Sequence, residues 1–201
     1  MSPGEAEPAL PYQPFYCEEN VWHACRAPRF AGRWPRAVFL SSAARAIVMW
    51  HQRAAPRLDA PVLWDYHVVL LVEAPWQVWD VDSTLGAPLD AATYLARSFP
   101  YAAPRPDDDA RSWRRRIPAE MAPRFRLVEA AELVARFASD RAHMRAPSGR
   151  YKQPPPPWPP IGAPGEPSNL SRFLDVDAPF LGEVLSFDDL FKRVRSVETP
   201  G

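Results

Sequence analysis

The chain has 201 residues, in which 24 Lys and Arg are balanced by 24 Asp and Glu, so its formal net charge is zero. This balance excludes the uniformly basic surface of many proteins that bind nucleic acids or anionic membranes, and we expect neither as a partner. A hydrophobic content of 47% indicates a folded domain. The proline content, 26 of 201 residues, is far above the usual ~5% of a chain.

The sequence shows no segment that would direct it out of the cytoplasm. No run approaches the ~18 to 20 continuous apolar residues of a membrane span, and residues 1–11 lack the apolar core of a signal peptide. We therefore expect a cytoplasmic protein with reduced cysteines and, because no heptad repeat occurs, a monomer. The basic run at 111–116 follows three acidic residues at 107–109, which indicates a solvated loop.

The first predicted element is a helix that follows an extended N-terminal arm at residues 1–15. Acidic residues in the first turn and apolar residues at helical spacing predict that it begins at Cys17 and ends before Pro28. From Tyr16 on, we expect a single domain over residues 16–201.

Four strands are predicted next. Short strands are expected at 37–40 and 46–51, with a turn between them. Residues 63–72 (LWDYHVVLLV) are β-branched and aromatic, which favours a central strand covered on both faces. A turn at 74–75 joins this strand to a second at 76–81 (WQVWDV), and together they predict an antiparallel hairpin.

The C-terminal half adds helices to the sheet. Helical spacing occurs at 89–99 and 130–139, with a strand at 124–128 between them. Residues 186–189 (SFDD) resemble a capping box that opens a last helix through Val194. The order of elements predicts an α/β (α+β) fold, with a mixed, largely antiparallel sheet flanked by helices.

A proline-rich loop is expected at 145–168, centred on 153–160 (QPPPPWPP). Such a run favours a stiff polyproline II segment. Three interpretations are open from the residues alone: a loop pinned to the surface, a docking segment for an aromatic groove, or a wall of the active site.

Cys17 is the better of the two candidate nucleophiles. At the start of the predicted helix, the macrodipole and the free N–H groups favour an anion such as a thiolate. Cys25 follows two turns later, about 12 Å away at a rise of 1.5 Å per residue, which is too far for a disulfide. We expect Cys25 to pack in the core.

His67 is the candidate base, because an imidazole in an apolar strand is costly unless it is hydrogen-bonded. With a two-residue turn, opposite positions of the hairpin have numbers that sum to 149. This register places His67 across from Asp82 and diagonal to Asp80, with both aspartates on the face of His67. A core histidine satisfied by a neighbour is the alternative on sequence alone.

A metal site is not expected. Cys17, His23, Cys25, His51 and His67 include possible ligands, but they form no C-x-x-C pair and no H-E-x-x-H motif. Glycine-rich phosphate loops and G-x-S-x-G elbows are also absent from the sequence. Nothing in the pattern therefore implies a cofactor.

Four sequence blocks carry a resemblance to a known family. They are residues 16–22 (YCEENVW), 64–71 (WDYHVVLL), 137–144 (FASDRAHM) and 149–158 (GRYKQPPPPW). In this combination and order, the chain resembles the protein N-terminal glutamine amidohydrolases. The resemblance implies a fold similar to transglutaminases and papain-like enzymes, and it favours the proline-rich tract as an ordered wall beside the substrate groove.

The resemblance also implies an activity and a catalytic triad. The family hydrolyses the side-chain amide of an N-terminal glutamine through a cysteine thioester, giving glutamate and ammonia without a cofactor. By motif, the triad residues match Cys17, His67 and Asp80. The connection between the histidine and aspartate strands looks shorter here than in animal members, which leaves Asp82 as an alternative to Asp80.

Recognition of a chain terminus requires a carboxylate for the free α-ammonium group. Glu19 and Asp65 are the expected substrate-binding residues, and Asp140 and Arg141 are expected to form an internal ion pair. The partners implied are proteins or peptides with an N-terminal glutamine. Two other classes stay open: a transglutaminase-like deamidase or crosslinker acting on internal glutamine, and a non-catalytic binding module.

Overall fold

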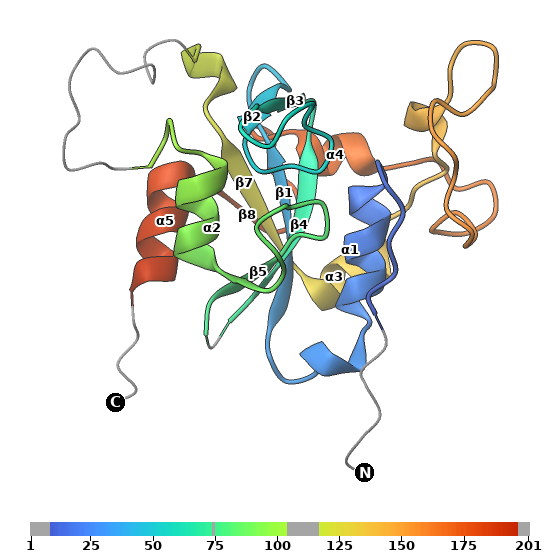
Figure 1. Cartoon of the computed structure of the whole chain (residues 1–201). Coiled ribbons are helices and arrows are strands. Elements are labelled where there is room, and N and C mark those ends of the chain that lie inside the picture. The colour runs from blue at the N-terminus through green and yellow to red at the C-terminus, as the bar shows by residue number, and fades with distance from the viewer. Residues whose placement is uncertain (1–8, 74, 104–116, 197–201) are drawn as a thin grey trace.

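A six-stranded sheet with helices on both faces forms the centre of this computed structural model, which describes residues 9–73, 75–103 and 117–196 (Figure 1). The strands are β1 (Pro35–Ser41), β2 (Ile47–Met49), β3 (Val62–Trp64), β4 (His67–Val72), β5 (Gln77–Trp79), β6 (Leu89–Asp90), β7 (Arg124–Glu129) and β8 (Glu183–Ser186). The helices are α1 (Cys17–Cys25), α2 (Ala91–Ser98), α3 (Ala130–Arg136), α4 (Leu170–Leu174) and α5 (Phe187–Arg195), with 3-10 turns η1 (Pro28–Phe30), η3 (Ala119–Met121) and η4 (Ala142–Met144).

The topology confirms the predicted fold class. The strand order of the large sheet is β6-β5-β4-β1-β7-β8, and its paired strands are antiparallel. β2 and β3 form a separate two-stranded sheet. Within the described residues, no helix is long and apolar enough to cross a membrane.

The two faces of the sheet carry two hydrophobic cores. In β1, Val38 and Leu40 pack in the core that includes α2 and α5, whereas Ala37 and Phe39 pack in the core of α1, α3 and α4. Figure 1 shows α2 and α5 on one side of the sheet and α1 and α3 on the other. Successive side chains of a strand point to opposite faces, so β1 and β4 are buried on both sides.

The strand predicted at 63–72 is two strands, which corrects that prediction. Its first part, β3, pairs with β2 in the small sheet, and the chain turns at Asp65, whose Oδ1 accepts the backbone N–H of Tyr66 at 3.0 Å. The central strand β4 begins only at His67. His67 therefore lies at the end of the sheet, where a side chain can face a pocket.

The hairpin of β4 and β5 has the predicted register. Leu70 pairs with Trp79 and Val72 with Gln77, so each pair of numbers sums to 149. The predicted turn at 74–75 includes residue 74, which lies outside the described residues. β5 is shorter than predicted and ends at Trp79, so the chain leaves the sheet just before the two aspartates.

The helix predicted at 89–99 starts two residues later. Asp90 is its N-cap, and its side chain accepts the backbone N–H of Thr93 at 2.8 Å, while residues 89–90 pair with β5 as β6. The helix predicted at 130–139 ends at Arg136, because Phe137 is extended. Each predicted helix is therefore shorter in the structure, the first because a strand precedes it and the second because an extended residue follows it.

Of the remaining helices and strands, some agree with the sequence prediction and others were not predicted. α1 begins at Cys17 as expected, and the Ser186 side chain caps α5 by accepting the Asp189 backbone N–H at 3.2 Å. The strand predicted at 46–51 is the shorter β2, and it does not pair with β1. β6, β8 and α4 were missed. The basic run at 111–116 lies outside the described residues.

Arg126 fixes the segment between α4 and β8. Its side chain is buried and donates to the backbone carbonyls of Phe173, Asp175, Ala178 and Leu181. A buried cation is stable only when its donors are satisfied, and here carbonyls at the end of α4 and in the loop that follows it satisfy them. This loop follows Leu174 of α4, which lines the pocket described next.

Candidate active site

Cys17 and His67 line one pocket of about 440 Å³ at an end of the sheet. Cys17 is the first residue of α1 and His67 is the first residue of β4, so two element starts meet there. Asp65 and Asp82 also line the pocket, and Asp65 is exposed. A second pocket of about 540 Å³ lies beside Phe180 and holds no cysteine, histidine or carboxylate, so it lacks the groups for thiol chemistry.

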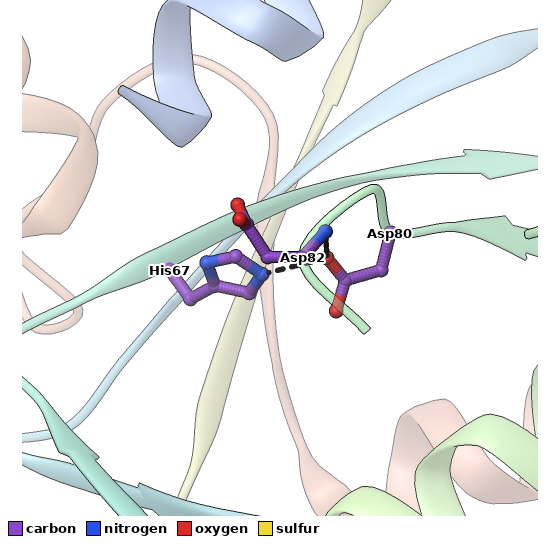
Figure 2. A group of neighbouring side chains, drawn as sticks. All are labelled: His67, Asp80 and Asp82. Carbon is purple, nitrogen blue, oxygen red and sulfur yellow. Dashed lines mark hydrogen bonds and ion pairs between the residues drawn. The ribbon is translucent and has the colours of Figure 1, made fainter. Parts of the chain in front are cut away.

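His67 and Asp80 form a buried pair at the centre of the site. The Nε2 atom of His67 lies 3.0 Å from Oδ1 of Asp80, and both side chains are almost completely buried (Figure 2). Asp80 also accepts the backbone N–H of Asp82 at 3.0 Å, the hydroxyl of Tyr94 at 2.8 Å and the amide of Gln52 at 3.3 Å. The geometry favours Asp80 over Asp82 as the partner of the imidazole.

The charges of this pair follow from its contacts. Burial acts to raise the pKa of Asp80, but His67 and the hydroxyl of Tyr94 outweigh it, and the pKa is lowered. Burial acts to lower the pKa of His67, but the Asp80 carboxylate outweighs it, and the pKa is raised. Asp80 is therefore a carboxylate at neutral pH, and it stabilises a protonated imidazole.

The imidazole is also held in orientation by an aromatic ring. The indole of Trp64 stacks on the ring of His67, with centroids 5.9 Å apart and an angle of 11° between the planes. Because Nε2 is directed at Asp80, the other ring nitrogen, Nδ1, points away from that carboxylate (Figure 2). Nδ1 is therefore the nitrogen available to a group in the pocket.

The thiol of Cys17 is less acidic than its position at a helix start suggests. Burial raises the pKa of Cys17 well above its usual value, and the charges of Glu18 and Asp82 raise it further. A hydrogen bond from the backbone of Val68 acts in the opposite direction but does not compensate. The expected anion-stabilising effect of the helix is outweighed, so the thiol is protonated at neutral pH and needs a base.

A metal ion would compete with the hydrogen bonds already present. The ligand atoms of His67, Asp80 and Asp82 lie within 4.8 Å of one another, which is close enough for three ligands. However, both carboxylate oxygens of Asp80 already accept hydrogen bonds, from the backbone, Tyr94 and Gln52 as well as from His67. These residues fit a histidine oriented by a carboxylate better than a metal centre.

The comparison with known proteins agrees with this geometry. A model of the N-terminal glutamine amidase family matches residues 12–194. The chain belongs to this family. It is 38% identical over 176 residues to the protein N-terminal glutamine amidohydrolase of Homo sapiens, covering 84% of this chain and 80% of that protein. The protein N-terminal glutamine amidohydrolase of Arabidopsis thaliana is 35% identical over 175 residues, covering 81% of this chain and 74% of that protein. The family suggested by the sequence blocks is confirmed.

Glu19 is held in an ion pair away from the pocket lining. It is fully buried, and its oxygens accept two hydrogen bonds of 2.8 Å from Arg141 and one of 2.7 Å from the indole N–H of Trp158. The prediction of an ion pair between Asp140 and Arg141 is wrong, because Arg141 pairs with Glu19. Asp140 is exposed and instead accepts the backbone N–H of Ala142 at 2.9 Å.

These contacts tie the proline-rich tract to α1. Besides Trp158, the tract is bound through the carbonyl of Gln153, which accepts the hydroxyl of Tyr16 at 3.2 Å, and the carbonyl of Pro154, which accepts the Gln13 amide at 3.0 Å. Lys152 and Gln153 line the pocket. The residues that precede Cys17 therefore hold one side of the pocket.

We expect Glu19→Ala to destabilise the fold strongly. The substitution leaves Arg141 buried without its carboxylate, which typically costs about 3–5 kcal/mol of the free energy of unfolding. The matched control is Glu183→Ala, since the pair of Glu183 and Arg193 is largely exposed and such pairs contribute about 1 kcal/mol or less. Urea unfolding of both variants measures the difference, and equal losses would contradict the assignment.

Sequence reasoning missed a polar cluster beside Cys17. Oε2 of Glu18 accepts the hydroxyl of Tyr66 at 3.1 Å and lies 3.7 Å from the sulfur of Cys17. Nε2 of His143 lies 3.2 Å from that hydroxyl and 3.4 Å from Oε1 of Glu18. His143 had no partner predictable from spacing, and its place in the FASDRAHM block is the signal that could have found it.

Proposed function

We propose that this chain hydrolyses the side-chain amide of an N-terminal glutamine in peptides and proteins, leaving glutamate and releasing ammonia. The observation that carries the proposal is a cysteine at a helix start in one pocket with a histidine bound to a buried carboxylate, in a member of the N-terminal glutamine amidase family. The roles proposed are nucleophile for Cys17, acid and base for His67, and orienting carboxylate for Asp80.

The first step is the attack of the thiol on the glutamine carboxamide. Nδ1 of His67 takes the thiol proton as the sulfur of Cys17 bonds to the side-chain carbonyl carbon, and the carbonyl electron pair moves to oxygen. The backbone N–H groups of Cys17 and Glu18 precede that of Glu19, which donates to the carbonyl of Tyr16, and these first two groups can hold this oxyanion. The raised pKa of His67 supports the transfer.

The second and third steps reverse the role of the histidine. When the carbon–nitrogen bond breaks, protonated His67 donates its proton to the leaving nitrogen, ammonia departs and a thioester with Cys17 remains. His67 then takes a proton from the water that attacks the thioester carbon. When the carbon–sulfur bond breaks, His67 returns this proton to the sulfur of Cys17, and glutamate is released. Throughout, Asp80 accepts the N–H at Nε2 and keeps Nδ1 directed at the reacting atoms.

We also propose that the protein acts in the cytoplasm as a monomer. Both cysteines are free, which agrees with a reducing compartment. The residues proposed for catalysis all come from one chain, so one copy supplies the complete set.

The proposal predicts activity at chain termini and not at internal positions. Two peptides of equal composition, one beginning with glutamine and one carrying it internally, would be incubated with the protein. Ammonia release and mass spectrometry then report amide-to-acid conversion. We expect conversion of the first peptide only. Equal conversion of both would indicate a transglutaminase-like deamidase, and conversion of neither by the folded protein would indicate a binding module.

A further inference from the structure

Asp82 is a carboxylate of the pocket that the proposed chemistry does not use. Its side chain lines the pocket, yet only 9% of the residue is exposed. The hydroxyl of Tyr12 donates to its Oδ1 at 2.7 Å. Figure 2 shows the Asp82 carboxylate beside the ring of His67 and directed away from the carboxylate of Asp80.

The surroundings of Asp82 leave its charge incompletely compensated. In the part of the chain that the structure describes, Tyr12 is the side chain that hydrogen-bonds to it. Burial raises the pKa of Asp82 and the nearby Asp80 carboxylate adds to this, while His67, Tyr12 and the charge of Arg53 only partly offset it. A cation bound in the pocket would supply the compensation that burial removes.

Asp82 lines the same pocket as Cys17, which is the pocket that a glutamine side chain would enter. Four single bonds separate the carboxamide carbon of glutamine from its α-nitrogen, which is a reach of roughly 5 Å. Asp82 and Cys17 face one pocket of about 440 Å³, so a group bound at the thiol lies in the same cavity as the carboxylate. A glutamine whose carboxamide meets the thiol can therefore extend its α-ammonium toward the Asp82 carboxylate.

The other acidic residues near the nucleophile fit this role less well. Glu19 is already bound by Arg141 and Trp158. Glu18 is fully buried and binds the Tyr66 hydroxyl. Asp65 lines the pocket but is exposed, where water and salt screen its charge.

We propose that Asp82, held by Tyr12, binds the α-ammonium group of the N-terminal glutamine and thereby restricts the reaction to chain termini. This inference rests on the proposed amidase function. An acylated or internal glutamine has no cation at that position and leaves the buried carboxylate unpaired. Fixing the substrate at both ends also disfavours asparagine, because its shorter side chain would hold the carboxamide away from the thiol.

The test uses two peptides that differ only in the α-amine of the first residue: one begins with glutamine, and the other with its analogue lacking the amine. We expect the wild-type protein to favour the amine-bearing peptide in kcat/KM by about 10- to 150-fold, as expected for a hydrogen bond to a charged group. Asp82→Asn should reduce this preference to near unity, mainly by raising KM for the glutamine peptide. Asp65→Asn is the matched carboxylate control and should keep the preference.

Several results would overturn the inference. Asp82→Asn could lower the rates for both peptides by the same factor, which would indicate that Asp82 supports the fold or His67 instead. Loss of the preference in Asp65→Asn and not in Asp82→Asn would assign the ammonium to Asp65. Equal use of both peptides by the wild-type protein would refute the inference without any variant. If the folded protein converts neither peptide, the proposed function itself fails.

Discussion

Cys17→Ala is expected to abolish ammonia release from a peptide that begins with glutamine. Without the sulfur no thioester can form, and loss of a nucleophile typically lowers kcat by about 10⁶-fold. Release of ammonia under steady-state conditions measures the effect. The variant should remain folded, because Ala fits the helix start and the partly polar pocket gains only a small space.

Cys25→Ala is the matched control, since it removes the other thiol from the same helix. Cys25 lies at the last residue of α1, away from the start where the pocket is formed, and burial raises its pKa to about 12. It was predicted to pack in the core, and it is half-buried and packs against the hydrophobic core of α1. We expect most activity to remain. An inactive Cys25→Ala beside an active Cys17→Ala would refute the assignment of the nucleophile.

Asp80→Asn is expected to lower kcat by roughly 10³- to 10⁴-fold, as for the orienting aspartate of other triads. The amide no longer fixes which nitrogen of His67 carries the proton. The carboxylate raises the pKa of His67, so its removal lowers that pKa. The limb of the pH–rate profile that His67 governs should therefore move to lower pH, which a purely structural defect would not produce.

Tyr94→Phe provides the comparison for Asp80→Asn. It removes the 2.8 Å hydrogen bond that the Tyr94 hydroxyl donates to Asp80. The hydrogen bond between His67 and Asp80 stays in place. We expect a much smaller loss of kcat and a pH profile close to that of the wild-type protein. If Asp80→Asn behaved like Tyr94→Phe, Asp80 would have no special role for the imidazole.

The local part of the site could be predicted from the sequence. The start of α1 followed from acidic and apolar spacing, and the hairpin register followed from a two-residue turn, which placed Asp80 and Asp82 near His67. These features depend on residues close together in the chain. The break of the predicted strand at Asp65 was missed, because residues 62–64 pair with β2 in another sheet.

The contacts that complete the site join distant parts of the chain. Glu19 and Arg141 are 122 positions apart, and Tyr12 and Asp82 are 70 apart, so no spacing rule connects them. The adjacent Asp140 and Arg141 looked like a pair, but the left-handed backbone of Arg141 accompanies a side chain directed at α1 instead. Burial of the Cys17 thiol likewise depends on tertiary packing, and it outweighs the local effect of the helix start.

The central claim is that Cys17 attacks the side chain of an N-terminal glutamine. A peptide whose first residue carries a diazoketone in place of the carboxamide would alkylate the attacking thiol, and peptide mapping by mass spectrometry would locate the label. The account predicts one label, on Cys17, that a peptide beginning with ordinary glutamine suppresses by competition. A label on Cys25, or no label on a protein that still deamidates glutamine peptides, would contradict it.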